Sequence, residues 1–167
     1  MTDDYPVALK KLSKLLFKDF KLSDFTRHQE SKEYSACRFR LKGKSVEFRL
    51  SKVTPKKVGA FVTIWKRNHA GITQPFDESD ELDFIIIVSE YENQFGAFIF
   101  PKSVLLEKKI MSVAGIGGKR GLRVYPSWDF ADNPQSKKTQ LWQNKYFVEL
   151  HDTEPKNQLI EKLFGIS

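Results

Sequence analysis

Three short segments of this chain are apolar on both of the faces that a β-strand presents. They cover residues 59–65, 84–88 and 96–100, where apolar or aromatic residues follow one another without alternating with polar ones. Such strands must be covered on both sides, because either face would otherwise expose apolar surface to water. We therefore expect a β-sheet that is flanked on both faces, at least in part, by helices.

Other patterns predict the remaining elements. Alternating residues at 37–41 and 46–50, on either side of a turn at Gly43 and Lys44, predict a hairpin that is apolar on one side and mainly cationic on the other. Residues 53–58 read as a loop around Pro55, and residues 122–125 as a further strand after the glycine-rich turn 114–121. Helical spacing or helix-start signals predict helices at 4–20, 102–111, 133–146 and 154–164, the last with Thr153 as N-cap and Pro155 in its first turn.

Short connections between the first five strands favour antiparallel pairing, because a parallel crossover needs about a dozen residues or more. The expected fold class is α+β, with a curved, mostly antiparallel or mixed sheet of about five or six strands and three or four helices. The chain has 167 residues, of which 40% are apolar, and no linker-like tract interrupts it, so we expect a single domain over residues 1–167.

Cys37 is the only cysteine in the sequence, which excludes an internal disulfide and a cysteine-based zinc cluster. Its apolar neighbours favour a packed core thiol over a nucleophile. The three histidines are far apart in sequence, so no zinc-binding pattern is present. No apolar run is long enough for a signal segment or a membrane span, and we expect a cytoplasmic protein without membrane insertion and without a small-molecule cofactor.

Charge is segregated along the chain. Residues 37–68 hold ten basic residues and one acid, Glu47, whereas residues 77–92 hold seven acids and no Lys or Arg. The net charge is +7 and the pI is about 9.4. A basic surface of this kind favours a polyanionic partner, and we expect nucleic acid, with duplex DNA preferred.

The candidate nucleic-acid-binding residues lie in two basic stretches and one aromatic turn. Glycines in the turn 114–121 would let main-chain N–H groups approach an anion, although the spacing is not that of a P-loop. Trp128 is the best candidate for an exposed ring that could stack on a base, whereas Trp65 and Trp142 have core-like neighbours. The full set is Lys52, Lys56, Lys57, Lys66, Arg67, Lys119, Arg120, Arg123 and Trp128.

The carboxylates leave a metal-dependent nuclease as an alternative, in which Glu47, Asp83 and Glu90 or Glu92 would hold Mg²⁺. The sequence lacks a clear Asp…Glu-x-Lys pattern, because Arg49 stands where the lysine would be needed. The competing interpretation is that Glu47 neutralises Arg38, Arg40 or Arg49 across the hairpin, and we favour it.

Several local runs resemble the MepB family of small bacterial proteins. They are residues 48–61, 64–67, 83–84, 96–101 and 123–126 together with Trp142, and the resemblance covers roughly residues 31–147. It implies a bacterial cytosolic protein of mixed α/β structure, sometimes encoded beside drug-efflux genes, with a core like that of restriction endonucleases. The departure from the Asp…Glu-x-Lys pattern makes DNA binding without cleavage the safer inference.

The leading hypothesis is thus a non-enzymatic protein that grips the phosphates of duplex DNA with little sequence specificity. The alternatives are the degenerate metal-dependent nuclease and a basic adaptor for an acidic protein partner. If about five phosphates are neutralised, the logarithm of the binding constant should fall with the logarithm of salt concentration at a slope of roughly −4 to −5.

Overall fold

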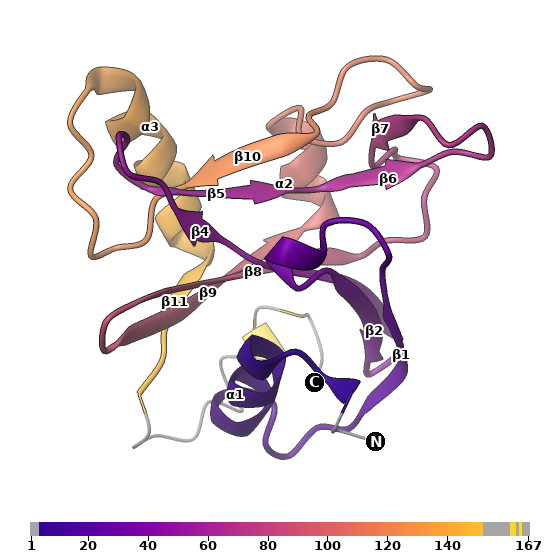
Figure 1. Ribbon diagram of the computed structural model, residues 1–167, viewed down its shortest axis with the longest axis horizontal. Helices are drawn as coiled ribbons and strands as arrows, with labels where there is room; N and C mark the ends of the chain where they lie inside the picture. Colours follow the sequence, from indigo (N-terminus) through magenta and orange to yellow (C-terminus); the bar gives the residue numbers. More distant parts are fainter. Residues whose placement is uncertain (1–3, 152–160, 163, 165–167) are drawn as a thin grey trace.

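The computed structural model describes residues 4–151, 161, 162 and 164. Apart from these last three residues, the helix expected over 154–164, with Thr153 and Pro155 at its start, lies outside the described part of the chain. Figure 1 shows a layered molecule in which α1 lies at one edge and α3 and β10 at the opposite edge.

A six-stranded sheet forms the centre of the molecule, with the order β1-β2-β3-β8-β9-β11. Its strands are β1 (Leu22–Arg27), β2 (Cys37–Leu41), β3 (Lys44–Leu50), β8 (Phe84–Tyr91), β9 (Gln94–Pro101) and β11 (Phe147–Glu149). All neighbouring pairs are antiparallel except β3 and β8, which are parallel. The chain between β3 and β8 is long enough for a parallel crossover, so the expected mixed sheet is confirmed.

Strands of that crossover, together with the later strand β10, build two smaller sheets. One has the order β10-β5-β4 and contains β10 (Gly121–Val124), β5 (Ala60–Thr63) and β4 (Lys52–Val53); the other pairs β6 (Trp65–Arg67) with β7 (Thr73–Pro75). The single strand expected over 59–65 is therefore wrong in detail. It breaks at Ile64, and its two parts enter different sheets. The expected loop at 53–58 begins one residue later, because Val53 still pairs with Ala60.

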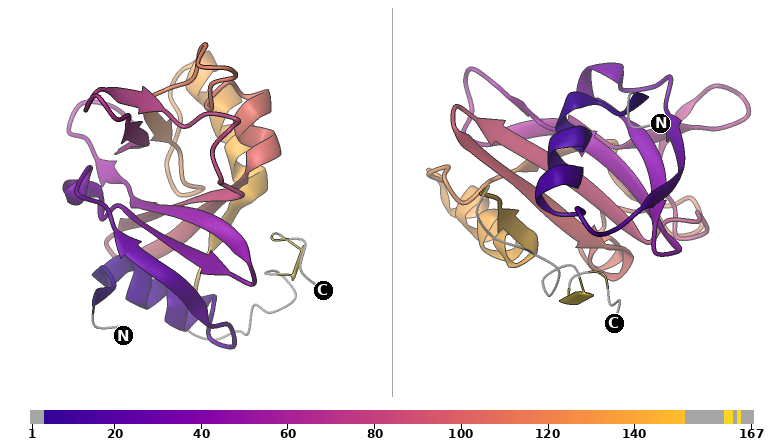
Figure 2. Two further views of the ribbon diagram at one scale, coloured as in Figure 1. Left: turned by 90° about the vertical axis from the view of Figure 1, so that its right-hand side faces the viewer. Right: turned by 90° about the horizontal axis from the view of Figure 1, so that it is seen from below.

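Three helices pack around the sheets: α1 (Val7–Leu15), α2 (Lys102–Glu107) and α3 (Pro134–Gln143). Two 3₁₀ turns, η2 (Lys32–Tyr34) and η3 (Asn144–Tyr146), complete the described elements. Figure 2 shows α1 on one side of the large sheet and the small sheets with α3 on the other. None of the helices in the described residues is long and apolar enough to span a membrane.

The two faces of the large sheet each bury a separate apolar core. In β8, Phe84, Ile86 and Val88 face the core under α1, whereas Ile85 and Ile87 face the core under the small sheet, α2 and α3. This arrangement confirms that the non-alternating strands are covered on both sides. The contribution of the small sheet to the second cover is not visible in the sequence pattern, because β5 and β10 are short.

The expected hairpin at 37–50 is confirmed, although its turn lies one residue earlier, at Lys42 and Gly43. Both residues have positive φ angles, 52° and 80°, as a tight two-residue hairpin turn requires. β2 is apolar on one face as expected. The opposite face of β3 is buried rather than wet, because the small sheet covers it, so that Glu47 and Arg49 are each only 1% exposed.

Gly96 on β9 is expected to tolerate no larger residue. A Cβ atom there would lie 2.4 Å from the ring of Phe147 and 2.8 Å from the carbonyl oxygen of Val148. Gly96→Ala should therefore lower the free energy of unfolding by about 1–3 kcal/mol, as judged by urea denaturation. In a Phe147→Leu background, Gly96→Ala should lower the free energy of unfolding by less, because the smaller leucine side chain can move away from the added methyl group. An unchanged stability of Gly96→Ala in the wild-type background would contradict the close packing of β9 on β11.

Candidate nucleic-acid-binding groove

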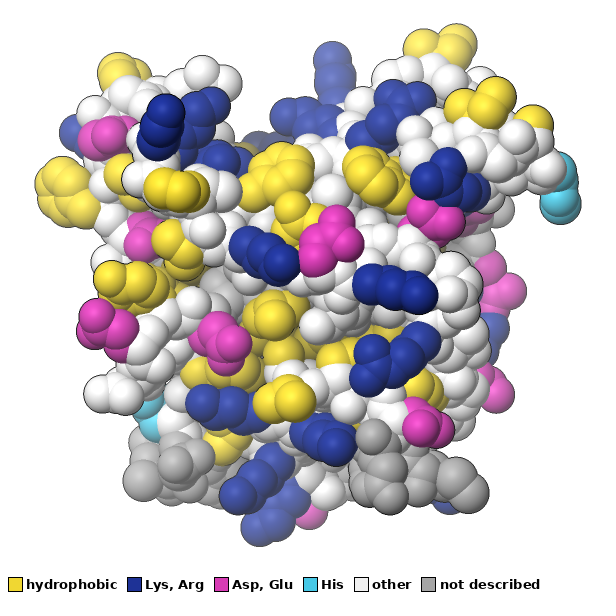
Figure 3. Space-filling view, viewed as in Figure 1, with side chains coloured by type: hydrophobic (Ala, Val, Ile, Leu, Met, Phe, Trp, Pro, Cys, Tyr) yellow, Lys and Arg dark blue, Asp and Glu magenta, His cyan; other side chains and the backbone are white. Residues whose placement is uncertain are grey.

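A groove of about 410 Å³ lies over β10, between the turn that follows β4 and the start of α3. Four of the predicted cationic residues line it: Lys56, Lys57, Lys119 and Arg123. They come from two segments that are far apart in the sequence, the turn between β4 and β5 and the stretch that leads into β10. Figure 3 shows the upper edge of the molecule hollowed between two raised parts, with Lys and Arg side chains in and around the hollow.

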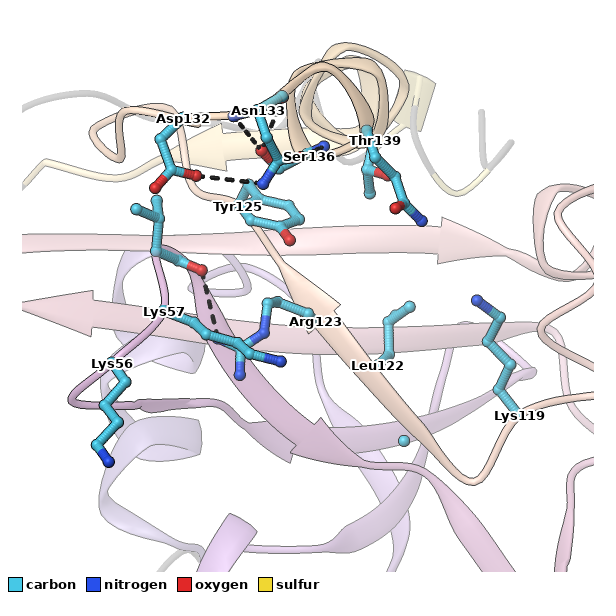
Figure 4. A pocket seen from close by; sticks show the side chains of 13 residues that line it. Lys56, Lys57, Lys119, Leu122, Arg123, Tyr125, Asp132, Asn133, Ser136 and Thr139 are labelled. Carbon is cyan, nitrogen blue, oxygen red and sulfur yellow. Dashed lines mark hydrogen bonds between the residues drawn. The ribbon is translucent and has the colours of Figure 1, made fainter.

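Arg123 lies in the middle of the groove. Its guanidinium connects β10, which forms the floor of the groove, to the turn after β4, which forms one wall. β10 pairs antiparallel with β5, which places Arg123 opposite Phe61. The Nη1 atom of Arg123 donates to Thr54 Oγ1 at 3.0 Å and to the carbonyl oxygen of Val58 at 3.3 Å. Both acceptors belong to the turn that carries Lys56 and Lys57, so Arg123 holds this turn beside β10 (Figure 4).

The lysines mark the two ends of the groove. Lys56 and Lys57 stand on the exposed turn between β4 and β5, and Lys119 precedes β10 at the other end. The main-chain N–H of Lys119 donates to the carbonyl oxygen of Ile110 at 2.9 Å, which fixes the backbone while the side chain stays exposed. Positively charged side chains thus stand at both ends of the groove, with Arg123 between them.

The second wall is the N-terminal turn of α3. Asn133 is the N-cap, and its side chain accepts from the main-chain N–H of Ser136 at 2.8 Å within a capping box. The first turn holds no acidic residue, so the positive end of the helix dipole faces the groove without a helix carboxylate to offset it. Asp132, just before the helix, is the one acid among the lining residues.

Tyr125 closes the groove below α3. Its main-chain N–H donates to Gln143 Oε1 at 2.9 Å, and its carbonyl oxygen accepts from Asn144 Nδ2 at 3.1 Å. The ring packs against Gly59, where a Cβ atom would lie 2.8 Å from it. Gly59 has a φ angle of 89°, so both the turn and the ring require glycine at this position.

The remaining predicted cations lie elsewhere. Lys52 is exposed on β4, with its ammonium 5.5 Å from the centroid of the Tyr34 ring. Lys66 and Arg67 on β6 pair with Asp80 at 2.5 Å and Glu30 at 2.7 Å. Arg120 donates to the carbonyl oxygen of Thr73, at 3.0 Å from Nη2. The sequence predicts these residues and the groove cations as one nucleic-acid-binding set, but the structure places these residues outside the lining of the groove.

The acidic segment that follows β7 folds back on the basic hairpin. Besides the pair of Asp80 with Lys66, Glu81 binds Arg40, and Asp83 Oδ2 accepts from the main-chain N–H of Ser45 at 2.9 Å. The acids therefore neutralise part of the basic stretch but, within the described residues, pair with none of the cations that line the groove. Charge counting along the sequence could not show which cations would be neutralised.

In the glycine-rich turn 114–121, a main-chain N–H binds a carboxylate of the protein itself. Gly115 donates to Asp77 Oδ1 at 3.0 Å, and Asp77 also accepts from Ser79 and Ser112. The hydrogen bonds from Ser79, Ser112 and Gly115 hold the pKa of Asp77 well below its usual range. The φ angle of Gly118 is 83°, and a Cβ there would lie 2.6 Å from Pro75. These two glycines shape and anchor the turn, and Lys119 is its contribution to the groove.

Trp128 is not the exposed ring that we expected. Its ring is partly buried and meets Phe147 edge to face, with centroids 5.5 Å apart. The exposed aromatic of this loop is Phe130, which is 83% exposed. The sequence signal was ambiguous, because both rings follow Pro126 in the same turn-rich run. Trp142 packs on Phe100 as a core residue should.

Glu47 contacts two arginines and one histidine. Its Oε1 lies 2.8 Å from His28 Nε2 and 3.2 Å from Arg49 Nη1, and its Oε2 lies 3.3 Å from Arg38 Nη1. Burial alone would raise the pKa of Glu47, but the hydrogen bond from His28 and the charges of Arg49, His28 and Arg38 together lower it. The expected cross-hairpin neutralisation is confirmed for Arg38 and Arg49, whereas Arg40 pairs with Asp24 and Glu81 instead.

The carboxylates of the nuclease alternative do not converge. Glu90 pairs with Phe95 near the end of β8, whereas Glu47 lies opposite Ile85, about 16 Å away at the usual strand rise. Within residues 4–151, 161, 162 and 164, no three His, Cys, Asp or Glu side chains lie close enough to hold a metal ion. Cys37 is fully buried, and this burial raises the pKa of its thiol to about 12, as expected of a core residue rather than a nucleophile.

Comparison with known proteins gives a consistent assignment. No curated protein matches the chain. A solved structure, the crystal structure of MepB, is similar with a TM-score of 0.76 and 32% sequence identity, and the match covers 86% of this chain and 97% of that one. The MepB-like family pattern matches residues 28–149, which include β2 to β11 and every residue that lines the groove. The chain belongs to the MepB-like family.

Proposed function

We propose that this protein binds nucleic acid by holding a phosphate backbone in the groove over β10. The observation that supports the proposal is the meeting of Lys56, Lys57, Lys119 and Arg123 on one concave surface, while Lys66 and Arg67 are paired with acids. We take duplex DNA as the reference ligand. The site of action would be the bacterial cytoplasm, where the lone Cys37 stays reduced.

The chemistry of the groove suits backbone contacts. Lys is a flexible point charge, and only Arg123 could make a two-pronged contact with a phosphate or a base edge. Binding should therefore be mainly electrostatic and weakly dependent on sequence. Nothing in the groove supplies convergent carboxylates for cleavage, so the proposal is for a binding protein rather than an enzyme.

The test is a fluorescence-polarisation titration of the protein into a short, labelled, mixed-sequence DNA duplex. It is run at three salt concentrations with EDTA present, so that cleavage does not interfere. The four groove cations together with Lys52 should give a slope of about −4 to −5 in a plot of log binding constant against log salt. Failure to bind at the lowest salt concentration would overturn the proposal and leave a basic adaptor for an acidic protein.

Neutralising Asp80 should strengthen binding if Lys66 lies on the path of the backbone. Asp80→Asn frees the Lys66 ammonium and keeps an oxygen that can accept from the main-chain N–H of Asp77. The salt slope should become steeper by about 0.9, the value for one additional phosphate contact. The gain should vanish in the double variant Asp80→Asn/Lys66→Ala. An Asp80→Asn variant with wild-type binding would exclude Lys66 from the interface.

A further inference from the structure

A second cationic cavity lies between the end of β1 and η2. It measures about 300 Å³ and is lined by Arg27, His28, Gln29, Lys32, Ser35 and Ala36. Three of these side chains can carry positive charge and none is acidic, and Gln29 and Ser35 add neutral donors. We propose that this cavity binds a second phosphate group of the same nucleic acid whose backbone occupies the groove over β10. The proposal therefore rests on the proposed function.

His28 is held so that one ring nitrogen remains free for a ligand. Its Nε2 lies 2.8 Å from Glu47 Oε1, and in the described part of the chain no partner contacts Nδ1. The ring is 30% exposed, whereas Glu47 is buried. A phosphodiester oxygen can accept from Nδ1 of the imidazolium, whereas the neutral ring that donates from Nε2 to Glu47 carries no proton on Nδ1. The imidazolium form of the ring thus matches a phosphate group.

The carboxylate behind His28 does not cancel the charge of the cavity. Arg49 and Arg38 both pair with Glu47 and balance its negative charge. The charges of Arg27 and Lys32 are therefore not needed to neutralise Glu47. Arg27 donates from Nε to the carbonyl oxygen of Asp4 at 2.8 Å, which fixes its guanidinium at the mouth of the cavity. A net positive charge therefore remains for a bound anion.

Main-chain hydrogen bonds fix the backbone that forms the walls of the cavity. Ser31 and Ser35, on either side of η2, both have left-handed φ angles, of 54° and 53°. Hydrogen bonds hold this shape: Ser31 O accepts from Tyr34 N at 2.9 Å and from Ala36 N at 3.3 Å, and His28 N donates to Ala36 O at 3.0 Å. Non-glycine residues in this conformation carry strain that the surrounding structure must offset, and such strain is concentrated at ligand sites.

Lys52 connects the two sites. Its ammonium lies over the ring of Tyr34, in the same 3₁₀ turn as Lys32. β4, which carries Lys52, runs directly into the turn with Lys56 and Lys57. A path of cations therefore leads from the groove along β4 to the cavity. The cations on this path lie on neighbouring segments of the protein, as binding to one continuous nucleic-acid backbone would require.

The experiment compares Arg27→Gln/Lys32→Gln with the wild type on labelled duplexes of increasing length. Short duplexes should bind both proteins equally, because they fill only the groove. Beyond a threshold length, the wild-type salt slope should become steeper by about 0.9, for one further phosphate, and the variant should lack this increase. Lys14→Gln/Lys18→Gln removes the same charge at the end of α1 and should behave as the wild type at every length.

A second measurement reports on the cavity itself. The ¹⁵Nδ1 resonance of His28 should shift on addition of the long duplex and stay in place with the short one. If the double variant follows the wild type at all lengths and the resonance does not move, the second site is refuted while the groove stands. If no duplex binds the wild-type protein, both the groove and the second site are refuted.

Discussion

Replacing Glu47 with Gln is expected to lower the free energy of unfolding by about 3–5 kcal/mol. The substitution keeps the shape of the side chain but removes the only carboxylate that contacts Arg49 in the described structure, and Arg49 is 1% exposed. A buried guanidinium without a counter-charge bears most of its desolvation cost. Urea denaturation followed by circular dichroism at neutral pH measures the loss.

The matched control is the double variant Glu47→Gln/Arg49→Met. Removing both charges leaves a long apolar side chain over the Phe76 ring, which the Arg49 guanidinium now covers at 5.9 Å from the centroid. Most of the lost stability should return, because the fully buried charge of Arg49 is gone and Arg38, which also contacts Glu47, is 32% exposed. A single variant as stable as the wild type would show that the carbonyl oxygens of Phe48 and Thr63 satisfy Arg49 by themselves.

The contacts of Glu47 also predict how the free energy of unfolding changes as the pH falls. The pKa of Glu47 is lower in the folded protein than in the unfolded chain, so the folded state favours the ionised form. Its stabilising contribution is therefore complete above the unfolded-state pKa of about 4.3 and is lost as the pH falls through the folded-state pKa. The wild type should lose more stability than Glu47→Gln over that acidic range.

Removing the three exposed groove lysines is expected to have the largest effect on binding. Lys56→Ala/Lys57→Ala/Lys119→Ala should reduce the magnitude of the salt slope by about 2.7 and weaken duplex binding by roughly two to three orders of magnitude at 0.1 M salt. These lysines are exposed, and none uses its side-chain nitrogen in a hydrogen bond within the described residues, so folding should be unaffected. Arg123 is left in place because it anchors the neighbouring turn.

Equal thermal unfolding of the triple variant and the wild type would show that the loss is one of binding. Lys14→Gln/Lys18→Gln again serves as the charge control, at the edge of the molecule opposite the groove (Figure 1). Should the triple variant retain the wild-type slope, the phosphate-binding surface would have to lie elsewhere on the protein.

Hydrophobic patterning was sufficient to predict the fold class and the order of most elements. The runs at 84–88 and 96–100 became central strands because their residues alternate between two cores, which is the physical reason for their lack of polar positions. The partition into three sheets could not be predicted. It depends on where the chain bends, at Ile64 and in the turn before β10, and these bends are set by tertiary contacts such as Gly118 against Pro75.

The candidate site was predicted in composition but not in geometry. Lys56 and Lys57 were predicted from their charge, and Lys119 and Arg123 from their charge and the neighbouring glycine-rich turn, and the fold brings all four to one groove. Lys66 and Arg67 were chosen on the same ground and are paired with acids that lie 14 or more residues away in sequence. The α3 wall and the Arg27, His28 and Lys32 cavity were missed, because their residues carry no distinctive spacing.

The parallel pairing of β3 with β8 bears on how the protein can be made. The main-chain N–H of Ser45 reaches Asp83, 38 residues further along the chain, so this seam closes late during synthesis and slowly during refolding. Until β8 emerges from the ribosome, one edge of β3 has no partner and could recruit another nascent chain. Glu47 and Arg49 lie on β3, the strand that has no partner at this stage. Their charges, costly to bury later, would discourage such mispairing until the native partner arrives.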